Sequence, residues 1–366
     1  MKLTVTQENL TKALATIGRV ASARTELPIL NNILLRTDGG RLLIAATNLE
    51  IAATQYIGAK IDAPGSITVP AKLISEFVAS LPSGTITIEV KDTHLHLTAG
   101  KFSSIIHGLA ADEFPELPTV DEHKAVTIEL TTDEFKKAVS QTVIATSGDP
   151  TRAVLTGVNW YSLDGELYLA ATDGYRLAEK SLGKTNDEIA AIIPASTLQE
   201  VLRSLHDGVS TVTVHFDEAQ VSFMMPELEI VSRLIDGKFP DYRQLIPANS
   251  ETVVVLQKAD FSRVVKIASL FARDSGGGIS LTASQEHGLL SVHSIASELG
   301  ENTSEAAAEV SHDGVVTLNS RYLIEALNAL DGDTVEFSFN GKLAPCILRQ
   351  HAKATDYKHV IMPLKR

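Results

Sequence analysis

The fold is decided by the stretch GSITVPAKLISEFVASLPSG at residues 65–84, in which an apolar strand pattern leads directly into a helical pattern. The same arrangement returns twice, as IAAIIPASTLQEVLRSLHDG at residues 189–208 and DGVVTLNSRYLIEALNALDG at residues 313–332. Leu73, Leu198 and Leu323 hold equivalent places in the three copies, about 125 residues apart. Three tandem repeats therefore account for nearly the whole chain.

A second series of helical patterns opens each repeat, with TQENLTKAL at residues 6–14, TTDEFKKAV at 131–139 and QKADFSRVV at 257–265. The segments EFPEL at 113–117 and KFPDY at 238–242 also lie one period apart. Each repeat therefore contains two helices, and we place the domains at residues 1–120, 121–248 and 249–366.

Apolar residues at helical spacing predict the buried face of the second helix in each repeat. The residues expected on that face are Leu73, Phe77 and Leu81, then Leu198, Leu202 and Leu205, then Leu323, Leu327 and Leu330. The segments that follow, at 85–90, 210–216 and 333–339, alternate apolar and polar residues, as strands with one covered face do. Short turn signals such as Asp164-Gly165 suit tight hairpins. The fold class is α+β, with two helices on one side of an antiparallel sheet in each repeat.

The chain of 366 residues carries a formal charge of −13, which opposes tight binding to nucleic acid by the surface as a whole. A local basic track remains compatible with that charge. Cys346 is the one cysteine, so no internal disulfide or cysteine metal cluster is expected. The amino terminus has no signal-peptide pattern, and we expect a cytoplasmic protein without a membrane span.

Catalytic and cofactor motifs are not found in the sequence, and no cofactor is expected. The run Ser275-Gly276-Gly277-Gly278 has no following lysine and leads into a strand pattern, so it reads as a connector. His94 and His96 alternate on one expected strand without an apparent third ligand, so no metal site is expected. Two alternatives stay open at this point. One is a carbohydrate- or nucleotide-processing enzyme built from three repeats, with Asp173 and Glu179 as acid and base, and the other is a scaffold that does not bind DNA.

Basic residues recur on the helices that open the repeats, in contrast to the acidic chain as a whole. They are Lys12, Arg19, Arg24, Lys136, Lys137, Arg263, Lys266 and Arg273. A few lysines on one helix usually form a solvated face, but repeats that align their free faces would join them into one basic surface. Two further segments are unusually apolar for a surface, namely the hairpin at 166–180 and the carboxyl tail at 359–364.

At these segments the chain resembles the bacterial sliding clamps, the beta subunits of DNA polymerase III. The motifs that carry the resemblance are LAADEFPEL at 109–117, ATDGYRLA at 171–178, DGKFPDYRQLIP at 236–247 and VIMPLKR at 360–366, in family order and spacing. The resemblance covers all 366 residues. It implies three similar domains in a crescent and a head-to-tail ring dimer that encircles duplex DNA, with sheets outside and helices inside. It also implies a non-catalytic processivity factor for the replicative polymerase.

The resemblance implies contacts to DNA without base readout and a dimer interface of opposite charges around an apolar centre. The implied DNA-contacting residues are Arg24, Lys72, Arg152, Asn319 and Tyr322. At the interface, Lys91, Lys101 and Ile105 or Ile106 of one protomer would meet Leu270, Phe271, Glu298, Glu301, Glu305 and Glu309 of the other.

The resemblance further implies an apolar pocket between the second and third domains that binds short peptide motifs with a glutamine as polar anchor. Its residues are Leu155, Thr172, Gly174, Tyr175, Arg176, Leu177, Pro240, Leu245, Cys346, Val360, Ile361, Met362, Pro363 and Leu364. The implied partners are duplex DNA, a second copy of the chain, the replicative polymerase subunit, the clamp loader, repair polymerases, ligase and mismatch-repair proteins. Tyr175 and Gln244 differ from residues common in relatives, so the peptide preference is not fixed by the resemblance.

Overall fold

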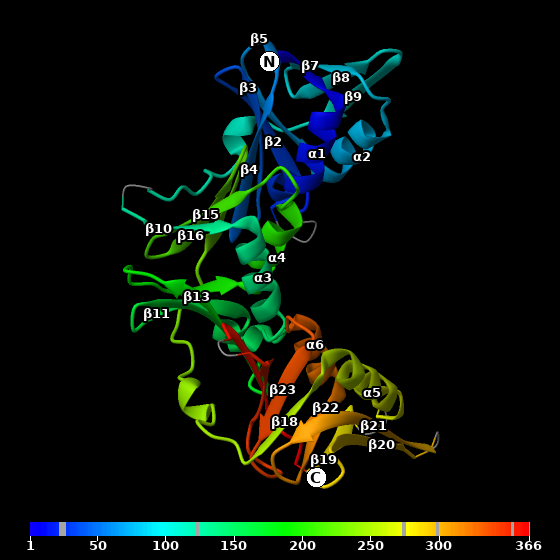
Figure 1. Cartoon of the computed structure of the whole chain (residues 1–366). Coiled ribbons are helices and arrows are strands. Elements are labelled where there is room, and N and C mark those ends of the chain that lie inside the picture. The colour runs from blue at the N-terminus through cyan, green and yellow to red at the C-terminus, as the bar shows by residue number, and fades with distance from the viewer. Residues whose placement is uncertain (22–26, 122–123, 273–275, 298–299, 353–354, 366) are drawn as a thin grey trace. The chain divides into compact units, whose positions relative to one another are not determined.

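The computed structural model describes residues 1–21, 27–121, 124–272, 276–297, 300–352 and 355–365. The chain forms two compact units (Figure 1). The first consists of Met1–Phe135 with Ser196–Leu234, and the second of Lys136–Ala195 with Ile235–Arg366. The middle repeat is thus divided between the units.

The first unit contains two antiparallel sheets. A five-stranded sheet has the order β5 (Lys60–Ala63), β1 (Lys2–Thr6), β7 (Thr85–Lys91), β8 (His94–Ala99) and β9 (Phe102–His107). An eight-stranded sheet has the order β10 (Val126–Thr131), β15 (Thr211–Phe216), β16 (Gln220–Met225), β17 (Leu228–Arg233), β4 (Ile51–Gly58), β3 (Arg41–Thr47), β2 (Asn32–Asp38) and β6 (Ser66–Pro70). Because β17 pairs with β4, strands of the first and middle repeats share one sheet.

The second unit is built on one twelve-stranded arrangement. Its order is β14 (Ala190–Pro194), β11 (Gly157–Leu163), β12 (Glu166–Thr172), β13 (Arg176–Lys184), β25 (Tyr357–Ile361), β24 (Cys346–Gln350), β23 (Thr334–Phe339), β18 (Thr252–Gln257), β21 (Gly300–Val310), β20 (Leu289–Ala296), β19 (Gly278–Ser284) and β22 (Gly314–Asn319). The antiparallel pairing of β13 with β25 joins the middle repeat to the last one. The middle and last repeats are thus joined by antiparallel strand pairing, as β4 and β17 join the first and middle repeats.

Each repeat contains the two expected helices, α1 (Gln7–Ile17) and α2 (Ala71–Ser80), α3 (Thr132–Val143) and α4 (Ala195–Ser204), α5 (Lys258–Phe271) and α6 (Ser320–Ala329). Within their units α1 packs against α2 and α5 against α6. The polar helix starts act as caps. At α3, Thr131 Oγ1 accepts a hydrogen bond from the Glu134 amide at 3.2 Å, and the Glu134 carboxylate accepts one from the Thr131 amide at 3.0 Å.

The predicted buried face is correct for α6, where Leu323, Leu327 and Leu330 are buried, and wrong for the start of α2. There the buried residues are Ala71, Ile74 and Val78, whereas Leu73 is 51% exposed. The helix begins at Ala71, directly after Pro70, with the Ala71 side chain packed into the core. Because α2 carries two adjacent apolar stripes, its periodicity alone does not select the inner one.

Short 3₁₀ turns complete the fold: η1 (Pro28–Asn31), η2 (Ala111–Glu113), η3 (Pro150–Leu155) and η4 (Arg243–Leu245). Of the expected connector at 275–278, Ser275 lies outside the described residues, Gly276 and Gly277 have positive φ, and Gly278 begins β19. No helix in the described part of the chain is long and apolar enough to cross a membrane.

Candidate functional site

The implied pocket residues all belong to the second unit, where segments distant in sequence meet. Antiparallel pairing places Leu177 of β13 opposite Val360 of β25, and Val360 opposite Ile347 of β24. Side chains opposite one another in a sheet project to the same face. A single apolar row therefore crosses three strands.

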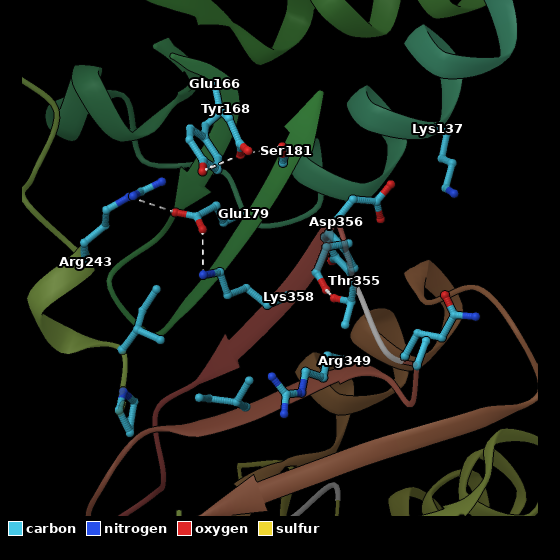
Figure 2. Close-up of a pocket in the computed structure, with 16 residues that line it drawn as sticks. Lys137, Glu166, Tyr168, Glu179, Ser181, Arg243, Arg349, Thr355, Asp356 and Lys358 are labelled. Carbon is cyan, nitrogen blue, oxygen red and sulfur yellow. Dashed lines mark hydrogen bonds and ion pairs between the residues drawn. The ribbon is translucent and has the colours of Figure 1, made fainter. Parts of the chain in front are cut away.

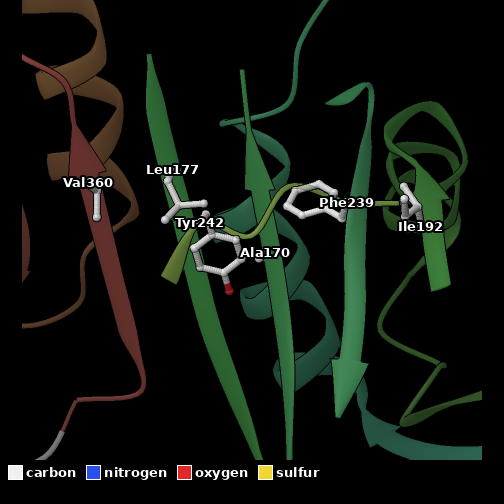
Figure 3. Packing of buried hydrophobic residues seen from close by; sticks show 6 residues of the cluster. All are labelled: Ala170, Leu177, Ile192, Phe239, Tyr242 and Val360. Atoms are coloured by element: carbon white, nitrogen blue, oxygen red, sulfur yellow. The ribbon is translucent and has the colours of Figure 1, made fainter. Parts of the chain in front are cut away.

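This row belongs to an apolar assembly that we call the pocket cluster, shown in Figure 3 and made of Ala170, Leu177, Ile192, Phe239, Tyr242 and Val360. Leu155, Val154, Ile246 and Ile347 pack against it. Phe239 and Tyr242 come from the segment that precedes η4, which runs over this face of the sheet. The pocket residues implied by the resemblance did not include these two aromatic residues, although the recurrence of Phe114 as Phe239 one period later was a signal for the first of them.

The rim of the pocket cluster exposes apolar side chains. Tyr175 is 60% exposed, Leu245 59% and Met362 36%, and Pro240 is exposed as well. Large apolar side chains exposed together beside a buried cluster are typical of a binding surface. These residues are therefore the accessible part of the implied pocket.

Two implied pocket residues, Cys346 and Ile361, lie in the core instead. They oppose each other across β24 and β25, and both are fully buried. Ile361 follows Val360 on its strand, so its side chain projects to the opposite face. Burial raises the pKa of the Cys346 thiol to about 12. These two residues support the sheet from beneath and do not line the pocket surface.

The turn before β13 presents Tyr175. The Asp173 carboxylate accepts hydrogen bonds from the amides of Tyr175 at 2.9 Å and Arg176 at 3.0 Å. Gly174, between Asp173 and Tyr175, has a φ of +90°, a backbone conformation in which a residue with a side chain would be strained. Thr172 Oγ1 accepts from the Gly174 amide at 3.1 Å and donates to the Arg176 carbonyl. The turn is thus fixed while the Tyr175 ring remains exposed.

The carboxyl tail is held against this turn by backbone hydrogen bonds. The Met362 amide donates to the Tyr175 carbonyl at 2.8 Å, and the Leu364 amide donates to the Thr317 carbonyl at 2.8 Å. Pro363 lies between them and is partly buried. These hydrogen bonds fix the tail beside the turn that presents Tyr175.

Arg176 points toward α6 and away from the pocket cluster. It is buried, forms ion pairs with Asp173 at 3.1 Å and with Glu325, and lies over the Tyr322 ring at 4.5 Å. Burial raises the pKa of the Tyr322 phenol, and the charge of Asp173 raises it further. Arg176 links the pocket turn to the helix that carries implied DNA contacts.

A buried carboxylate lies beside the pocket cluster on the same sheet face. Glu179 is 2% exposed, and it accepts hydrogen bonds from the hydroxyl of Tyr242 and, at 2.8 Å, from Nζ of Lys358. Arg243 Nε lies 3.4 Å from the same carboxylate, and Tyr161 also donates to it. Burial would raise the pKa of Glu179, but hydrogen bonds from Lys358 and Tyr242 and the positive charges of Lys358 and Arg243 outweigh burial and lower it. Asp173 and Glu179, the acid and base of the enzyme alternative, thus both have structural partners.

The implied DNA-contacting residues differ in their availability. The Lys72 side chain is 88% exposed, whereas Arg152 donates hydrogen bonds to the Asp173 carbonyl at 2.8 Å and to Ser147 at 2.9 Å. Asn319 caps α6 through its Oδ1, which accepts from the Arg321 amide at 2.9 Å. Arg24 lies outside the described residues.

Several basic residues on the helices that open the repeats have carboxylate partners within their own unit. Lys12 pairs with Glu8, Arg19 with Glu200, Lys137 with Asp331 and Arg263 with Asp260. The basic bias seen in the sequence is therefore partly neutralised on these helices.

The implied interface residues lie on strand edges and at a helix end. On β9, the outer strand of the five-stranded sheet, Ile105 is 55% exposed, whereas Ile106 is buried. Ile105 is therefore the accessible one of the pair, and Lys101 beside β9 is exposed. In the other unit Leu270 is 54% exposed and Phe271 is partly buried. Glu301, Glu305 and Glu309 are exposed on β21, and Glu298 lies outside the described residues.

Among the described residues, no group of histidine, cysteine, aspartate or glutamate side chains is arranged to hold a metal ion.

Comparison with known proteins identifies the family. The models of the N-terminal, central and C-terminal domains of the DNA polymerase III beta subunit match residues 1–118, 129–241 and 243–365. A beta sliding clamp of Bacillus subtilis is 31% identical over 95% of this chain and 96% of that protein, and one of Synechococcus elongatus is 30% identical over 95% of each.

Solved structures agree with the sequence matches. The sliding clamp of Bacillus subtilis superimposes with a TM-score of 0.95 and 30% identity, covering 100% of this chain and 99% of that chain. The clamp of Bartonella birtlesii, solved bound to griselimycin, gives a TM-score of 0.94 and 27% identity, with 100% of each chain covered. The three repeats, the antiparallel sheets and the paired helices thus have one common explanation: the chain belongs to the beta sliding clamp family, the non-catalytic beta subunits of DNA polymerase III.

Proposed function

We propose that two copies of this chain close head to tail into a ring around duplex DNA and so tether the replicative polymerase. The family membership carries the proposal. In a head-to-tail ring each interface joins two different surfaces, so the surfaces must be complementary. Retention on DNA then comes from enclosure and needs no tight binding, which suits a chain with a net charge of −13. The proposed domains are residues 1–120, 121–248 and 249–366.

The proposed interface joins β9 of one protomer to β21 of its partner. In the described residues, β9 pairs only with β8, and residues 300–307 of β21 pair only with β20. Each strand thus has a free edge for hydrogen bonding. Exposed Ile105 and Lys101 on one edge complement exposed Leu270 and the acidic side chains of β21 on the other. This complementarity of edge, charge and apolar area supports a closed ring.

DNA contact in the proposed ring is electrostatic and independent of sequence. Lys72 is the freest of the implied contacts, because its side chain is 88% exposed and its nearest carboxylate, that of Glu76, lies 3.9 Å away. Arg152, Asn319 and Tyr322, together with Arg24, remain proposed contacts. Weak contacts to phosphates position the duplex without stopping movement along it.

The pocket cluster and its exposed rim are the proposed docking site for partner peptides. Tyr175, Leu245 and Met362 offer apolar contact at the surface, and Leu177 with Val360 forms the floor. Apolar anchors in a small pocket give modest affinity, so one partner can replace another. The proposed partners are the polymerase subunit, the clamp loader, repair polymerases, ligase and mismatch-repair proteins.

Retention on DNA tests the ring. The protein is loaded onto nicked circular DNA by a clamp loader with ATP, and release is followed before and after linearisation, in salt high enough to suppress electrostatic binding. We expect retention on circles and loss from linear ends. An Ile105→Asp variant should dissociate from circles as well, whereas Leu163→Asp, a change at an exposed apolar residue on β11 outside the proposed interface, serves as a control. Equal release of the parent protein from both DNA forms would refute enclosure.

A further inference from the structure

A cavity of about 850 Å³ in the second unit lies next to the pocket cluster (Figure 2). Ile246 and Ile347 line this cavity and also pack against the pocket cluster. The cavity and the apolar surface therefore share a wall. A peptide seated on the cluster would meet the cavity as soon as it extends past these two residues.

The strand register shows how the surface changes from one region to the next. Leu177, Val360 and Ile347 form the apolar row across β13, β25 and β24. Two residues along the same strands, on the same face, the next row is Glu179, Lys358 and Arg349. Strands rise about 3.3 Å per residue, so the two rows lie roughly 7 Å apart. An extended peptide crosses that distance in about two residues.

The ion pairs of the second row turn their cations toward solvent. Lys358 is 40% and Arg243 36% exposed, whereas Glu179, which both of them contact, is 2% exposed. Arg349 is 49% exposed and its partner Glu336 13%. The buried carboxylate of Glu179 thus pairs with two cations, and Figure 2 shows Arg243 and Lys358 reaching it from two directions. A ligand in this part of the cavity meets guanidinium and ammonium groups.

Carboxylates line the other part of the same cavity. Asp356 is 56% exposed beside buried Lys180, and Glu166 accepts a hydrogen bond from the Tyr168 hydroxyl at 2.8 Å. In the view of Figure 2 both lie above Lys358 and Arg349. Acidic side chains from a ligand would be repelled from that part and attracted to Lys358 and Arg349 of the second row and to Arg243 of η4, which together we call the cationic row. This division favours binding of anions next to the apolar row.

We propose that the cationic row of Arg243, Lys358 and Arg349 binds aspartate or glutamate side chains that flank the apolar motif of a partner peptide. The inference rests on the proposed docking of peptides at the pocket cluster, and it adds a charge preference to that site. Charge complementarity and continuity with the apolar row support this occupant. Buried Glu179 and partly buried Glu336 keep the cations in place, so a bound carboxylate adds a new ion pair without a conformational change.

Binding of two synthetic peptides tests the proposal. Both contain the same apolar and aromatic core with one glutamine, and their flanks carry either aspartate and glutamate or asparagine and glutamine. Fluorescence anisotropy with the whole protein should show that the acidic peptide binds about three- to tenfold more tightly at low salt, as expected for a few half-exposed ion pairs. The advantage should shrink as salt is raised.

Variants locate the effect. Arg349→Gln should reduce the advantage of the acidic peptide at least about twofold, Arg349→Lys should keep most of it, and Lys342→Gln, at an exposed lysine outside the cavity, should leave it unchanged. The amide-flanked peptide must bind parent and variants equally, which shows that each variant is folded.

The outcomes separate the two proposals. If neither peptide binds the parent protein, the docking function itself is refuted. If both bind with equal affinity, docking stands and the charge preference is overturned. An acidic advantage that persists undiminished in Arg349→Gln combined with Lys358→Gln also overturns the inference, because the acidic flank would then bind elsewhere.

Discussion

His359 should make this protein sensitive to mild acid. The side chain is completely buried on β25, its Nδ1 lies 2.9 Å from the Tyr357 hydroxyl, and its Nε2 has no hydrogen-bond partner among the described residues. Burial, with a smaller contribution from the charge of Arg176, lowers the pKa of His359 from 6.5 to about 3. The folded protein therefore holds this imidazole neutral.

The sign and size of the effect follow from linkage. Below pH 6.5 the unfolded chain binds a proton at His359 and the folded chain does not, so stability is full above that pH and falls as the pH decreases toward 3. Each pH unit is worth about 1.4 kcal/mol, so at pH 5 the loss is about 2 kcal/mol. For a cooperative unit of roughly 150–250 residues, that corresponds to a fall in Tm of about 4–8 °C.

The measurement compares His359→Gln with the parent by scanning calorimetry at pH 7, 6 and 5. The variant will be less stable at pH 7 because the site is tightly packed, but its Tm should fall less between pH 7 and 5 than that of the parent. His287→Gln, a change at an exposed histidine, controls for the removal of one imidazole. If parent and His359→Gln lose Tm in parallel, the buried neutral imidazole does not cause the acid sensitivity.

Three further predictions concern the pocket and the ring. Glu179→Ala should cost about 1.5–3 kcal/mol of folding free energy, because it removes the charge-assisted hydrogen bonds to this buried carboxylate while the half-exposed Lys358 and Arg243 turn to solvent. Tyr242→Phe, which removes one hydrogen bond to that carboxylate, should cost less, about 0.5–1.5 kcal/mol. Equal losses in denaturant titrations would contradict the central role of the carboxylate. Tyr175→Ala should weaken peptide binding while changing the free energy of unfolding by less than about 0.5 kcal/mol. Leu177→Ala should weaken peptide binding and also lower the free energy of unfolding by about 2–5 kcal/mol. Peptide titration together with chemical denaturation separates the effect on binding from the effect on stability. Ile105→Asp should shift the protein to monomers in analytical ultracentrifugation, and an unchanged dimer would exclude β9 from the interface.

The internal repeat continues from sequence into packing. Ala45 and Phe114 pack together in an apolar cluster of the first unit, and Ala170 and Phe239, one period later, pack together in the pocket cluster of the second. The first and second copies differ at two positions that belong to the proposed docking site. The place of Leu177 is taken by Ala52 in the first copy, and the place of Tyr175 by Glu50. The first copy therefore lacks the large apolar side chains that the second copy has at these two positions.

Family resemblance named many of the residues that the structure gathers at the pocket cluster and its rim, but not the contacts that hold them in place. It named Leu177, Val360 and the exposed rim, and it also named Cys346 and Ile361, which the pleat of the sheet turns into the core. It did not name Glu179 as a support, since a carboxylate on a strand gives no local sign of burial. Only the pairing of β13 with β25 brings Lys358 to it.

The sequence by itself determined the three repeats, the helices and strands in each, and the family. Local periodicity and the order and spacing of motifs are sufficient for these, and both can be read from a single sequence. The tertiary structure alone decided which apolar stripe faces inward, as the exposure of Leu73 on α2 shows, and which rows of side chains meet. Leu177 and Val360 are neighbours through strand pairing between distant segments. Such register is set by the packing of whole faces against one another, and periodicity within one segment carries no information about its partner.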